Sequence, residues 1–347
     1  MKKFLSILLC MLMVCASVSA LAAGEKVGVS MPTKDLQRWN QDGENMKNLL
    51  EQAGYEVDLQ FASNDVQQQL NQITNMVNNG CKVVVISAVE GSSLGSALDL
   101  AKEKGVVVFA YDRLLMESDA VSYYATFDNY KVGTVQGNYI KEALDLDNAE
   151  GPFNLEITAG DPGDNNALYF YQGAIDVLQP YLDAGKLVVK SGQIAFNDVA
   201  TPTWKTEVAQ TRATTVLGNY ADGSNIDAWL CSNDSTALGV INALEDNYEG
   251  EWPIITGQDC DKSNVKKMIE GKQSMSVFKD TRTLAAQVVK MVGQALAGET
   301  VEVNDTTTYN NNVITVPSYL CEPVFGSADN YMELLIDSGY YKLEDVQ

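Results

Sequence analysis

The 347-residue chain contains no histidine. Histidine is the usual general base of enzymes, a common zinc ligand and a member of most catalytic triads, so its absence argues against those kinds of site. An enzyme built from this chain would have to work with carboxylates or lysines alone. The GxGxxG fingerprint and the Gly-Lys-Ser/Thr phosphate loop are also absent, which argues against a nucleotide-binding protein.

Basic residues are scarce as well. The chain has 24 Lys and Arg against 46 Asp and Glu, for a net charge of −22. Proteins that bind nucleic acid depend on basic patches, so we expect no nucleic-acid partner. The acidity is typical of a solvated surface that keeps a soluble protein apart from its neighbours.

Cysteines are few, and none is placed like a metal ligand. Four of the six follow the first 23 residues, and no pair has the spacing of a metal site: Cys81, Cys231, Cys260 and Cys321. The acids of the polar stretch 145–151 also miss the calcium-loop pattern. We therefore expect no metal and no cofactor, and we interpret the cysteines as small buried hydrophobes, although one disulfide remains open in an oxidising compartment.

The first 23 residues have the pattern of a signal peptide. Two lysines at positions 2 and 3 precede a mostly apolar stretch, residues 4–18, and Ala20-Leu21-Ala22 offers a cleavage site. The apolar stretch is too short to span a membrane comfortably. Cys15 follows residues that fit a lipid-attachment site poorly. We therefore expect an exported, soluble protein of the periplasm or the outer face of the cell envelope, without a lipid anchor.

The remainder of the chain alternates strands and helices. Its length suits two domains. Apolar strand patterns recur at residues 26–31, 55–61, 82–86, 106–110 and 122–127, and a second series begins at residue 153 and ends with residues 313–316. Amphipathic helical patterns separate most of these strands. This order predicts an α/β fold with two doubly wound parallel-sheet domains.

Polar residues follow these strands, and the clearest case is the stretch Gly105 to Arg113. A buried strand runs directly into Asp112 and Arg113. Open α/β sheets bind ligands at the carboxyl ends of their strands, so we favour a ligand contact for this pair over a local ion pair. Similar residues follow other strands: Arg38, Trp39, Asp164, Asn166, Asn233, Asp234, Gln258, Asp259 and Lys279.

If the two domains face each other, these side chains line one cleft that suits a neutral polyol. Carboxylates accept hydrogen bonds from hydroxyls, Arg and Lys donate them, and Asn does both. Trp39 and Trp204 lie in polar contexts and are expected to cover the apolar face of a sugar. Trp229 and Trp252 lie in or beside an apolar strand and are expected in the core. For Asn166 and its neighbour, helix capping is the alternative interpretation.

The motifs that carry these residues resemble a known family. The chain is similar to the periplasmic pentose- and hexose-binding proteins of ATP-binding-cassette (ABC) transporters, and most similar to their xylose-binding and multiple-monosaccharide-binding branch. The motifs run in family order across essentially the whole chain after the signal peptide: RWNQD (38–42), AYDR (110–113), YYATFDN (123–129), DNNA (164–167), SNDST (232–236), GQD (257–259), FKDTR (278–282) and VPSYL (316–320).

The resemblance implies the type I periplasmic binding protein fold, in which two lobes are joined by three hinge segments and hold the sugar between them. The first lobe would comprise residues 26–127 and 279–305, and the second 128–278 and 306–347. The family's sugar contacts carry over to Arg38, Trp39, Asp112, Arg113, Asp164, Asn166, Trp204, Asn233, Asp259 and Lys279. The match around Trp204 is the weakest, and Cys260 stands where the family has a small apolar residue.

The implied function is capture of a monosaccharide and its delivery to a transporter. An aldopentose or aldohexose such as xylose, glucose, galactose or arabinose would shift the protein to a closed form. That form would be recognised by an ABC permease with its ATPase. The protein would be a monomer and not an enzyme. The alternative is a sugar sensor that serves a chemoreceptor or a sensor kinase.

Two other hypotheses fit the sequence less well. The effector-binding core of a repressor shares this fold, but it would need a basic helix-turn-helix where the signal peptide lies. A glycosidase could use Asp112 and Asp259 as paired acids, and it would hydrolyse aryl glycosides. The sequence leaves open which sugar and anomer bind, and how tightly.

Overall fold

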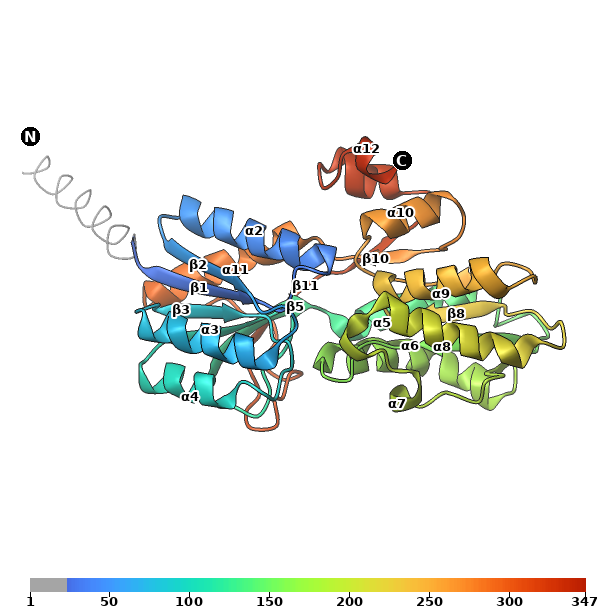
Figure 1. Cartoon of the computed structure of the whole chain (residues 1–347), viewed down its shortest axis with the longest axis horizontal. Coiled ribbons are helices and arrows are strands. Elements are labelled where there is room, and N and C mark those ends of the chain that lie inside the picture. The colour runs from blue at the N-terminus through green and yellow to red at the C-terminus, as the bar shows by residue number, and fades with distance from the viewer. Residues whose placement is uncertain (1–23) are drawn as a thin grey trace, which may run out of the picture. The chain divides into compact units, whose positions relative to one another are not determined.

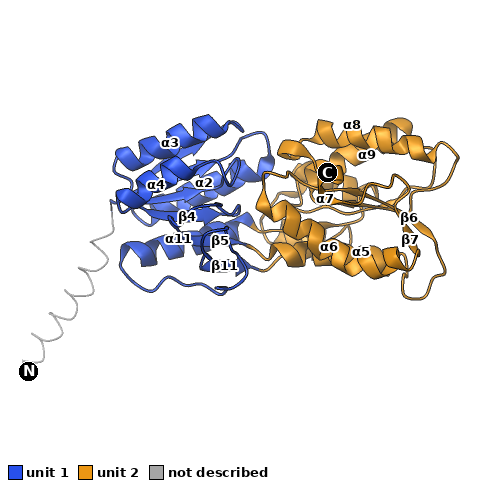
Figure 2. Ribbon diagram, turned by 90° about the horizontal axis from the view of Figure 1, so that it is seen from below, with its two compact units in different colours: residues 1–126, 281–321 blue, residues 127–280, 322–347 orange. Residues whose placement is uncertain are grey.

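The computed structural model describes residues 24–347, so the predicted signal peptide lies outside the described residues. The chain forms two compact units (Figure 2). Unit 1 contains the residues up to Thr126 together with Thr281–Cys321, and unit 2 contains Phe127–Asp280 and Glu322–Gln347. Each unit is an α/β sandwich, as the strand and helix pattern predicts.

Unit 1 is built on a six-stranded sheet in the order β11-β5-β4-β3-β1-β2. The pairs among β1 to β5 are parallel. Val29 of β1 lies opposite both Leu59 and Val85, and the four residues of β3 are all buried, as expected of strands covered on both faces. The strands are β1 (Lys26–Met31), β2 (Glu56–Phe61), β3 (Val83–Ile86), β4 (Val107–Tyr111), β5 (Val121–Phe127) and β11 (Ser318–Cys321).

Two pairs of helices cover the sheet of unit 1. Helix α2 packs against α11, and α3 packs against α4; α2 and α3 lie on opposite sides of the strands (Figure 1). Asp65 caps α3 by accepting a hydrogen bond from the Gln68 amide, and Ile73 and Val77 of this helix are buried. The helices are α2 (Gln37–Gln52), α3 (Val66–Asn78), α4 (Gly95–Glu103) and α11 (Thr281–Leu296).

Unit 2 contains a parallel four-stranded sheet in the order β7-β6-β8-β9. Strands β10 and β12 form a short antiparallel pair. A parallel bridge between Val277 of β10 and Gln258, which follows β9, connects this pair to the chain at the end of β9. The strands are β6 (Phe153–Thr158), β7 (Leu187–Val188), β8 (Ala228–Cys231), β9 (Ile254–Ile255), β10 (Ser276–Phe278) and β12 (Val324–Gly326).

The helices of unit 2 also pack in pairs, α5 with α6 and α8 with α9, on the two sides of the sheet (Figure 2). Glycines allow α5 and α6 to touch through their backbones: a Cβ on Gly133 would lie 2.0 Å from the Phe170 carbonyl oxygen, and one on Gly173 would lie 2.1 Å from that of Tyr130. The main helices are α5 (Asn129–Ala143), α6 (Asn165–Asp183), α8 (Thr206–Leu217), α9 (Asp234–Asn247) and α10 (Lys262–Ile269). Shorter turns are α7 (Phe196–Val199), η1 (Pro202–Trp204), η2 (Gly218–Tyr220), η3 (Met332–Asp337) and α12 (Leu343–Val346).

The third passage of the chain between the units differs from the expected one. The sequence predicts that the chain returns to the second unit after residue 305. In the structure it returns after Cys321, because β11 forms the edge strand of the unit 1 sheet, beside β5. The polar stretch before β11 is also anchored in unit 1: Asn311 is fully buried and donates to the carbonyl oxygens of Leu115 and Ser118 at 3.0 and 2.7 Å. Residues 313–316, expected to be a strand, are irregular, and the strand follows them.

Candidate ligand-binding site

In unit 1, Asp112 and Arg113 directly follow β4 and are 4% and 6% exposed. Asp112 has a φ of +59°, a conformation that L-residues other than Asn and Asp rarely adopt. Its carbonyl oxygen accepts hydrogen bonds from the hydroxyls of Tyr124, at 2.6 Å, and Thr126, at 2.9 Å. The neighbouring strand β5 therefore holds the strained residue in place.

Arg38 connects helix α2 to the end of β4. Its Nη2 donates to Asp112 Oδ2 at 2.8 Å and to Asp42 Oδ2 at 2.9 Å, and its Nε donates to Asp42 Oδ2 at 3.1 Å. All three side chains are at most 9% exposed. The guanidinium is thus held between two buried carboxylates, one on its own helix and one at the strand end.

Trp39 lies beside both arginines of this cluster. The guanidinium carbons of Arg38 and Arg113 are 4.4 and 5.0 Å from the centre of its ring, a cation–π arrangement. Arg113 Nη1 also donates to the Ala88 carbonyl oxygen at 2.9 Å. Trp39 is 2% exposed, and its Nε1 has no hydrogen-bond partner within the described part of the chain. The four residues predicted in unit 1 therefore form one contiguous cluster, Arg38, Trp39, Asp112 and Arg113.

In unit 2, a second cluster lies at the carboxyl ends of β6, β8, β9 and β10. Lys279 Nζ lies 3.0 Å from Asp259 Oδ1 and 5.3 Å from the centre of the Phe170 ring. Phe170 meets Trp204 edge to face, with ring centres 6.3 Å apart. Trp204 Nε1 in turn donates to Asp164 Oδ2 at 3.3 Å. These contacts link residues that are separated by more than a hundred positions in the sequence.

Asn166 and Asn233 belong to the same cluster. Asp164 is the N-cap of α6 and accepts the Asn166 backbone amide, so capping does not account for the Asn166 side chain. Its Oδ1 accepts from Asn129 Nδ2 at 3.0 Å. Asn233 caps α9 through its oxygen and donates through Nδ2 to Ser235. The Asn233 side chain is therefore engaged at the start of α9.

The position of Trp204 depends on a glycine. A Cβ on Gly160 would lie 1.9 Å from the indole, so the ring rests directly on the backbone that follows β6. Thr203 and Trp204 have φ values of +56° and +57°, which fold the short η1 turn so that the indole reaches this place. Although its sequence match is the weakest, Trp204 joins the other predicted residues, and it is 4% exposed.

A buried acid supports the loop that carries Asp259. Asp234 is fully buried; its Oδ1 accepts from Gln273 and Ser276, both at 2.8 Å, and its Oδ2 accepts from the Asp261 amide at 2.8 Å. Burial raises its pKa well above the usual value. The loop is strained, with φ of +96° at Asp259, and Asp234 fixes the residues around it.

The sequence analysis missed some members of both clusters. Asp42 and Asn129 lie inside quoted motifs, but nothing in a motif shows which side chains meet. Phe170 lies in the apolar sequence LYFY and has the pattern of a core residue. Tyr111, the last residue of β4, donates to Asp42 Oδ1 at 2.5 Å. These contacts depend on spatial neighbours that the sequence places far apart.

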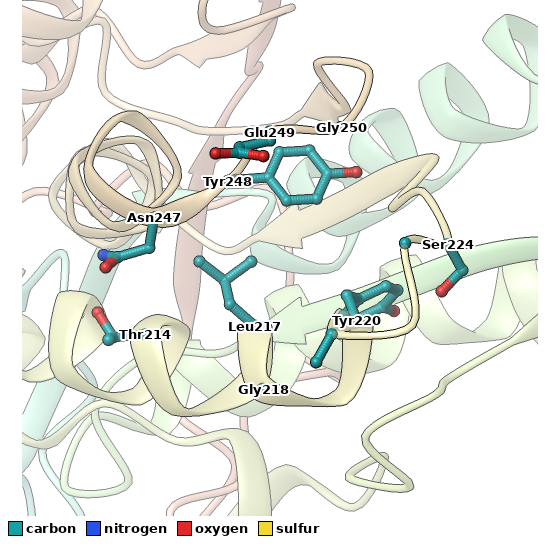
Figure 3. Close-up of a pocket in the computed structure, with 11 residues that line it drawn as sticks. Thr214, Leu217, Gly218, Tyr220, Ser224, Asn247, Tyr248, Glu249 and Gly250 are labelled. Carbon is teal, nitrogen blue, oxygen red and sulfur yellow. The ribbon is translucent and has the colours of Figure 1, made fainter.

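A cavity of about 610 Å³ lies elsewhere on unit 2, near the amino ends of β8 and β9, with Tyr248 on one side and Leu217 and Tyr220 on the other (Figure 3). The hydroxyls of its two tyrosines are already engaged. The Tyr220 hydroxyl donates to Glu156, and the Tyr248 hydroxyl accepts from the Ile226 amide. The cavity shares no lining residue with the strand-end cluster.

Three further findings concern residues 24–347. Within this range, no group of three or more Cys, Asp or Glu is placed to hold a metal ion. The same range contains no helix whose length and apolar character would suit a membrane span. The four cysteines of this range are buried, as predicted, and none of them forms a disulfide with another.

Residues 27–300 match the family model described as a periplasmic binding protein domain. The chain belongs to this family. It is 46% identical over 325 residues to the multiple sugar-binding periplasmic receptor ChvE of Rhizobium radiobacter, a match that covers 92% of each chain. It is 32% identical to the D-xylose-binding periplasmic protein of Escherichia coli, over 96% of each. The motif-based resemblance to the xylose and multiple-sugar branch is therefore confirmed.

Solved structures agree with this assignment. The chain is similar to an ABC transporter solute binding protein from Clostridium phytofermentans with bound β-D-glucose, at 66% identity and a TM-score of 0.92, covering 93% of this chain and all of the other. A carbohydrate transporter solute binding protein from Chloroflexus aurantiacus, in complex with D-glucose, has 34% identity and a TM-score of 0.83, covering 92% of this chain and 98% of the other. The predicted type I fold is confirmed.

Proposed function

We propose that this protein captures aldoses outside the cytoplasm, with D-glucose and D-xylose as its first ligands, and delivers them to an ABC sugar importer. The chain is a sugar-binding periplasmic binding protein. Support for the ligand class comes from relatives named for xylose and multiple sugars and from the similar glucose-bound structures. Export rests on the signal-peptide pattern of residues 1–23.

The single observation that carries the proposal is the unit 2 cluster. It combines a cation, carboxylates, amides and two aromatic rings within one set of contacts: Lys279, Asp259, Asp164, Asn166, Asn233, Phe170 and Trp204. Asn233 joins this set through the Ser235 hydroxyl, which also donates to the Trp204 carbonyl oxygen. A sugar has alternating hydroxyl edges and apolar C–H faces, so it needs both kinds of group. We propose that these residues, except Phe170, bind the sugar together with Arg38, Trp39, Asp112 and Arg113 of unit 1.

Discrimination among sugars follows from the burial of these groups. A donor or acceptor left unpaired on binding costs about 1–3 kcal/mol, which corresponds to a difference in affinity of roughly fivefold to 140-fold. A sugar with a misplaced hydroxyl leaves such groups unpaired. We therefore expect a limited set of aldoses to bind well and their epimers to bind more weakly.

A thermal-shift panel on the protein without residues 1–23 tests the proposal. The sugars are glucose, xylose, galactose, arabinose, ribose and fucose, with calorimetry on those that respond. A ligand that binds only the folded state raises the unfolding midpoint once its concentration exceeds its dissociation constant. A rise with glucose or xylose supports the proposal, and no rise with any aldose contradicts it.

Sensing is a second candidate function, favoured by one observation: a relative with 46% identity is named a receptor. Under this alternative, the sugar-bound protein would be recognised by a chemoreceptor or a sensor kinase. Deletion of the gene distinguishes the two, because loss of sugar uptake supports transport, whereas loss of only a sugar response supports sensing. We further propose that the protein is a monomer, which sedimentation of the sugar-bound and sugar-free forms tests.

We propose that the protein is not an enzyme. The two acids that could serve a glycosidase each form an ion pair within their own cluster, Asp112 with Arg38 and Asp259 with Lys279. Such paired carboxylates suit the acceptance of hydrogen bonds from hydroxyls. Incubation with aryl glycosides tests this, and any turnover that is lost in Asp112→Asn would contradict it.

A further inference from the structure

Asp42 is a buried acid that the sugar-contact set does not include. It lies on α2, one turn after Arg38, and is fully buried. Oδ2 accepts from both Nε and Nη2 of Arg38, at 3.1 and 2.9 Å, and Oδ1 accepts from the Tyr111 hydroxyl at 2.5 Å. The carboxylate therefore contacts the helix on one side and strand β4 on the other.

Asp42 and Asp112 share the same guanidinium, but their surroundings differ. Asp112 lies at the open carboxyl end of β4, directly before Arg113, whereas Asp42 lies beneath it, against the last residue of the strand, Tyr111. Two of the guanidinium nitrogens are directed at Asp42. In its absence, the same donors can turn to Asp112, whose carboxylate is itself a proposed sugar ligand.

We propose that Asp42, held by Tyr111, is a positioning residue for sugar binding. It fixes the Arg38 guanidinium, so that Arg38 and Asp112 are already oriented to hydrogen-bond the sugar. This proposal rests on the proposed function. An arginine side chain has considerable rotamer entropy to lose when it is immobilised. A guanidinium that is already fixed before the sugar arrives avoids that loss at the moment of binding.

The unfavourable position of Asp42 supports a role beyond folding. Burial and the nearby Asp112 raise its pKa, while Arg38 and Tyr111 lower it, and the net pKa is about 6. An amide or an apolar side chain would fill the site without the cost of burying a charge. Strained or costly groups of this kind cluster at functional sites.

Calorimetric titration of glucose and xylose into four proteins tests the role: wild type, Asp42→Asn, Tyr111→Phe and Glu156→Gln. Asp42→Asn is expected to lower affinity at least tenfold, and Tyr111→Phe to lower it less, since the carboxylate remains. Glu156 is the matched control, because it is also a fully buried acid with a tyrosine hydroxyl partner, Tyr220 at 2.8 Å, but lies outside both clusters. Glu156→Gln is expected to bind sugar as wild type does.

A double-mutant cycle separates positioning from general damage. In an Arg38→Met background, Asp42→Asn is expected to cause no further loss, because the group it positions is gone. A panel of deoxy-sugars adds a second readout: Asp42→Asn should weaken discrimination at the same hydroxyl as Arg38→Met does. Thermal unfolding shows whether each variant is folded. If Asp42→Asn does not fold, the affinity of Tyr111→Phe is used as the test instead.

Each other outcome overturns the inference in a recognisable way. Unchanged affinity in Asp42→Asn, or in Tyr111→Phe where Asp42→Asn does not fold, contradicts it. So does an equal loss in Glu156→Gln, or a loss that persists in the Arg38→Met background. A wild-type protein that binds no aldose instead overturns the proposed function, and the role of Asp42 falls with it.

Discussion

The ammonium of Lys279 lies 3.0 Å from Asp259 Oδ1 and 5.3 Å from the centre of the Phe170 ring. Both charged side chains are less than a tenth exposed. Neither charge could remain so deeply buried without the other. The pair therefore connects the end of β10 to the end of β9 and places two charged groups beside an aromatic ring.

Lys279→Met is expected to reduce both stability and sugar affinity. The change breaks the buried ion pair of Asp259 by removing the ammonium, a loss of about 3–5 kcal/mol in comparable cases. Adding Asp259→Asn should recover most of the stability but not the affinity. Urea unfolding and calorimetry measure the two effects. Lys272, which lies 3.8 Å above the Trp252 ring away from the cluster, supplies the control, and Lys272→Met should retain wild-type affinity.

Asp112→Ala is expected to abolish measurable sugar binding while the protein stays folded. A hydrogen bond from a charged group contributes about 1.5–3 kcal/mol, and the change also leaves Arg38 without one of its two carboxylates. Asp112→Asn is the better-matched variant, because Asn tolerates the positive φ of this residue. Calorimetric affinity equal to wild type in Asp112→Asn would show that the carboxylate has no role in binding.

Gly160→Ala is expected to displace the Trp204 ring, because the new methyl group would lie 1.9 Å from it. We expect at least a tenfold loss of sugar affinity and a lower unfolding temperature. Gly95 provides the control: it opens α4, and a Cβ there meets nothing within 4 Å. Gly95→Ala should leave affinity unchanged. Equal affinity in the two variants would argue against a role for the indole in the site.

Asp42 should also give the protein a characteristic pH dependence. Its pKa in the folded protein, about 6, lies above the value of 3.8 of an unperturbed aspartate. The folded state therefore binds this proton more tightly, so the contribution of Asp42 to stability falls as pH rises from about 4 to about 6 and is constant above. A shift of about two pKa units corresponds to about 3 kcal/mol.

The measurement is the free energy of unfolding of Asp42→Asn minus that of wild type, by urea titration at pH 3 to 7.5. This difference should increase by about 3 kcal/mol over that range. Asp222 gives a control of opposite sign, since hydrogen bonds from Lys190 and Ser224 lower its pKa. For Asp222→Asn, the difference should instead decrease as pH rises through the pKa of an unfolded aspartate. A flat profile for Asp42→Asn would contradict the assigned pKa.

Many residues of the two clusters could be predicted because strand ends are visible in the sequence. A buried apolar run followed at once by Asp112 and Arg113 places both residues at a known edge of a parallel sheet. Asp42 could not be found in this way, because its partner Tyr111 looks like the last core residue of a strand. Phe170 was missed for a similar reason, since an aromatic residue in an apolar helix has the same pattern whether it faces the core or a ligand.

The third boundary between the units illustrates a different limit. The stretch NDTTTYNNN, residues 304–312, is polar and has the composition of a linker. In the structure its Asn311 is buried and donates to two backbone carbonyl groups of the loop between β4 and β5. Composition alone does not show that an asparagine is satisfying the backbone groups of a distant loop.

The backbone contact between α5 and α6 has a consequence for how ligand preference can change. Gly133 of α5 lies against a backbone carbonyl oxygen of α6, and Gly173 of α6 lies against one of α5. The two helices therefore have no room to slide or to accept larger side chains at their crossing. Asn129 and Asn166, which stand near the starts of these helices, are therefore held at a constant separation. New sugar preferences are expected to evolve in this unit by exchanging such side chains on a fixed frame, while the glycines at the crossing stay unchanged.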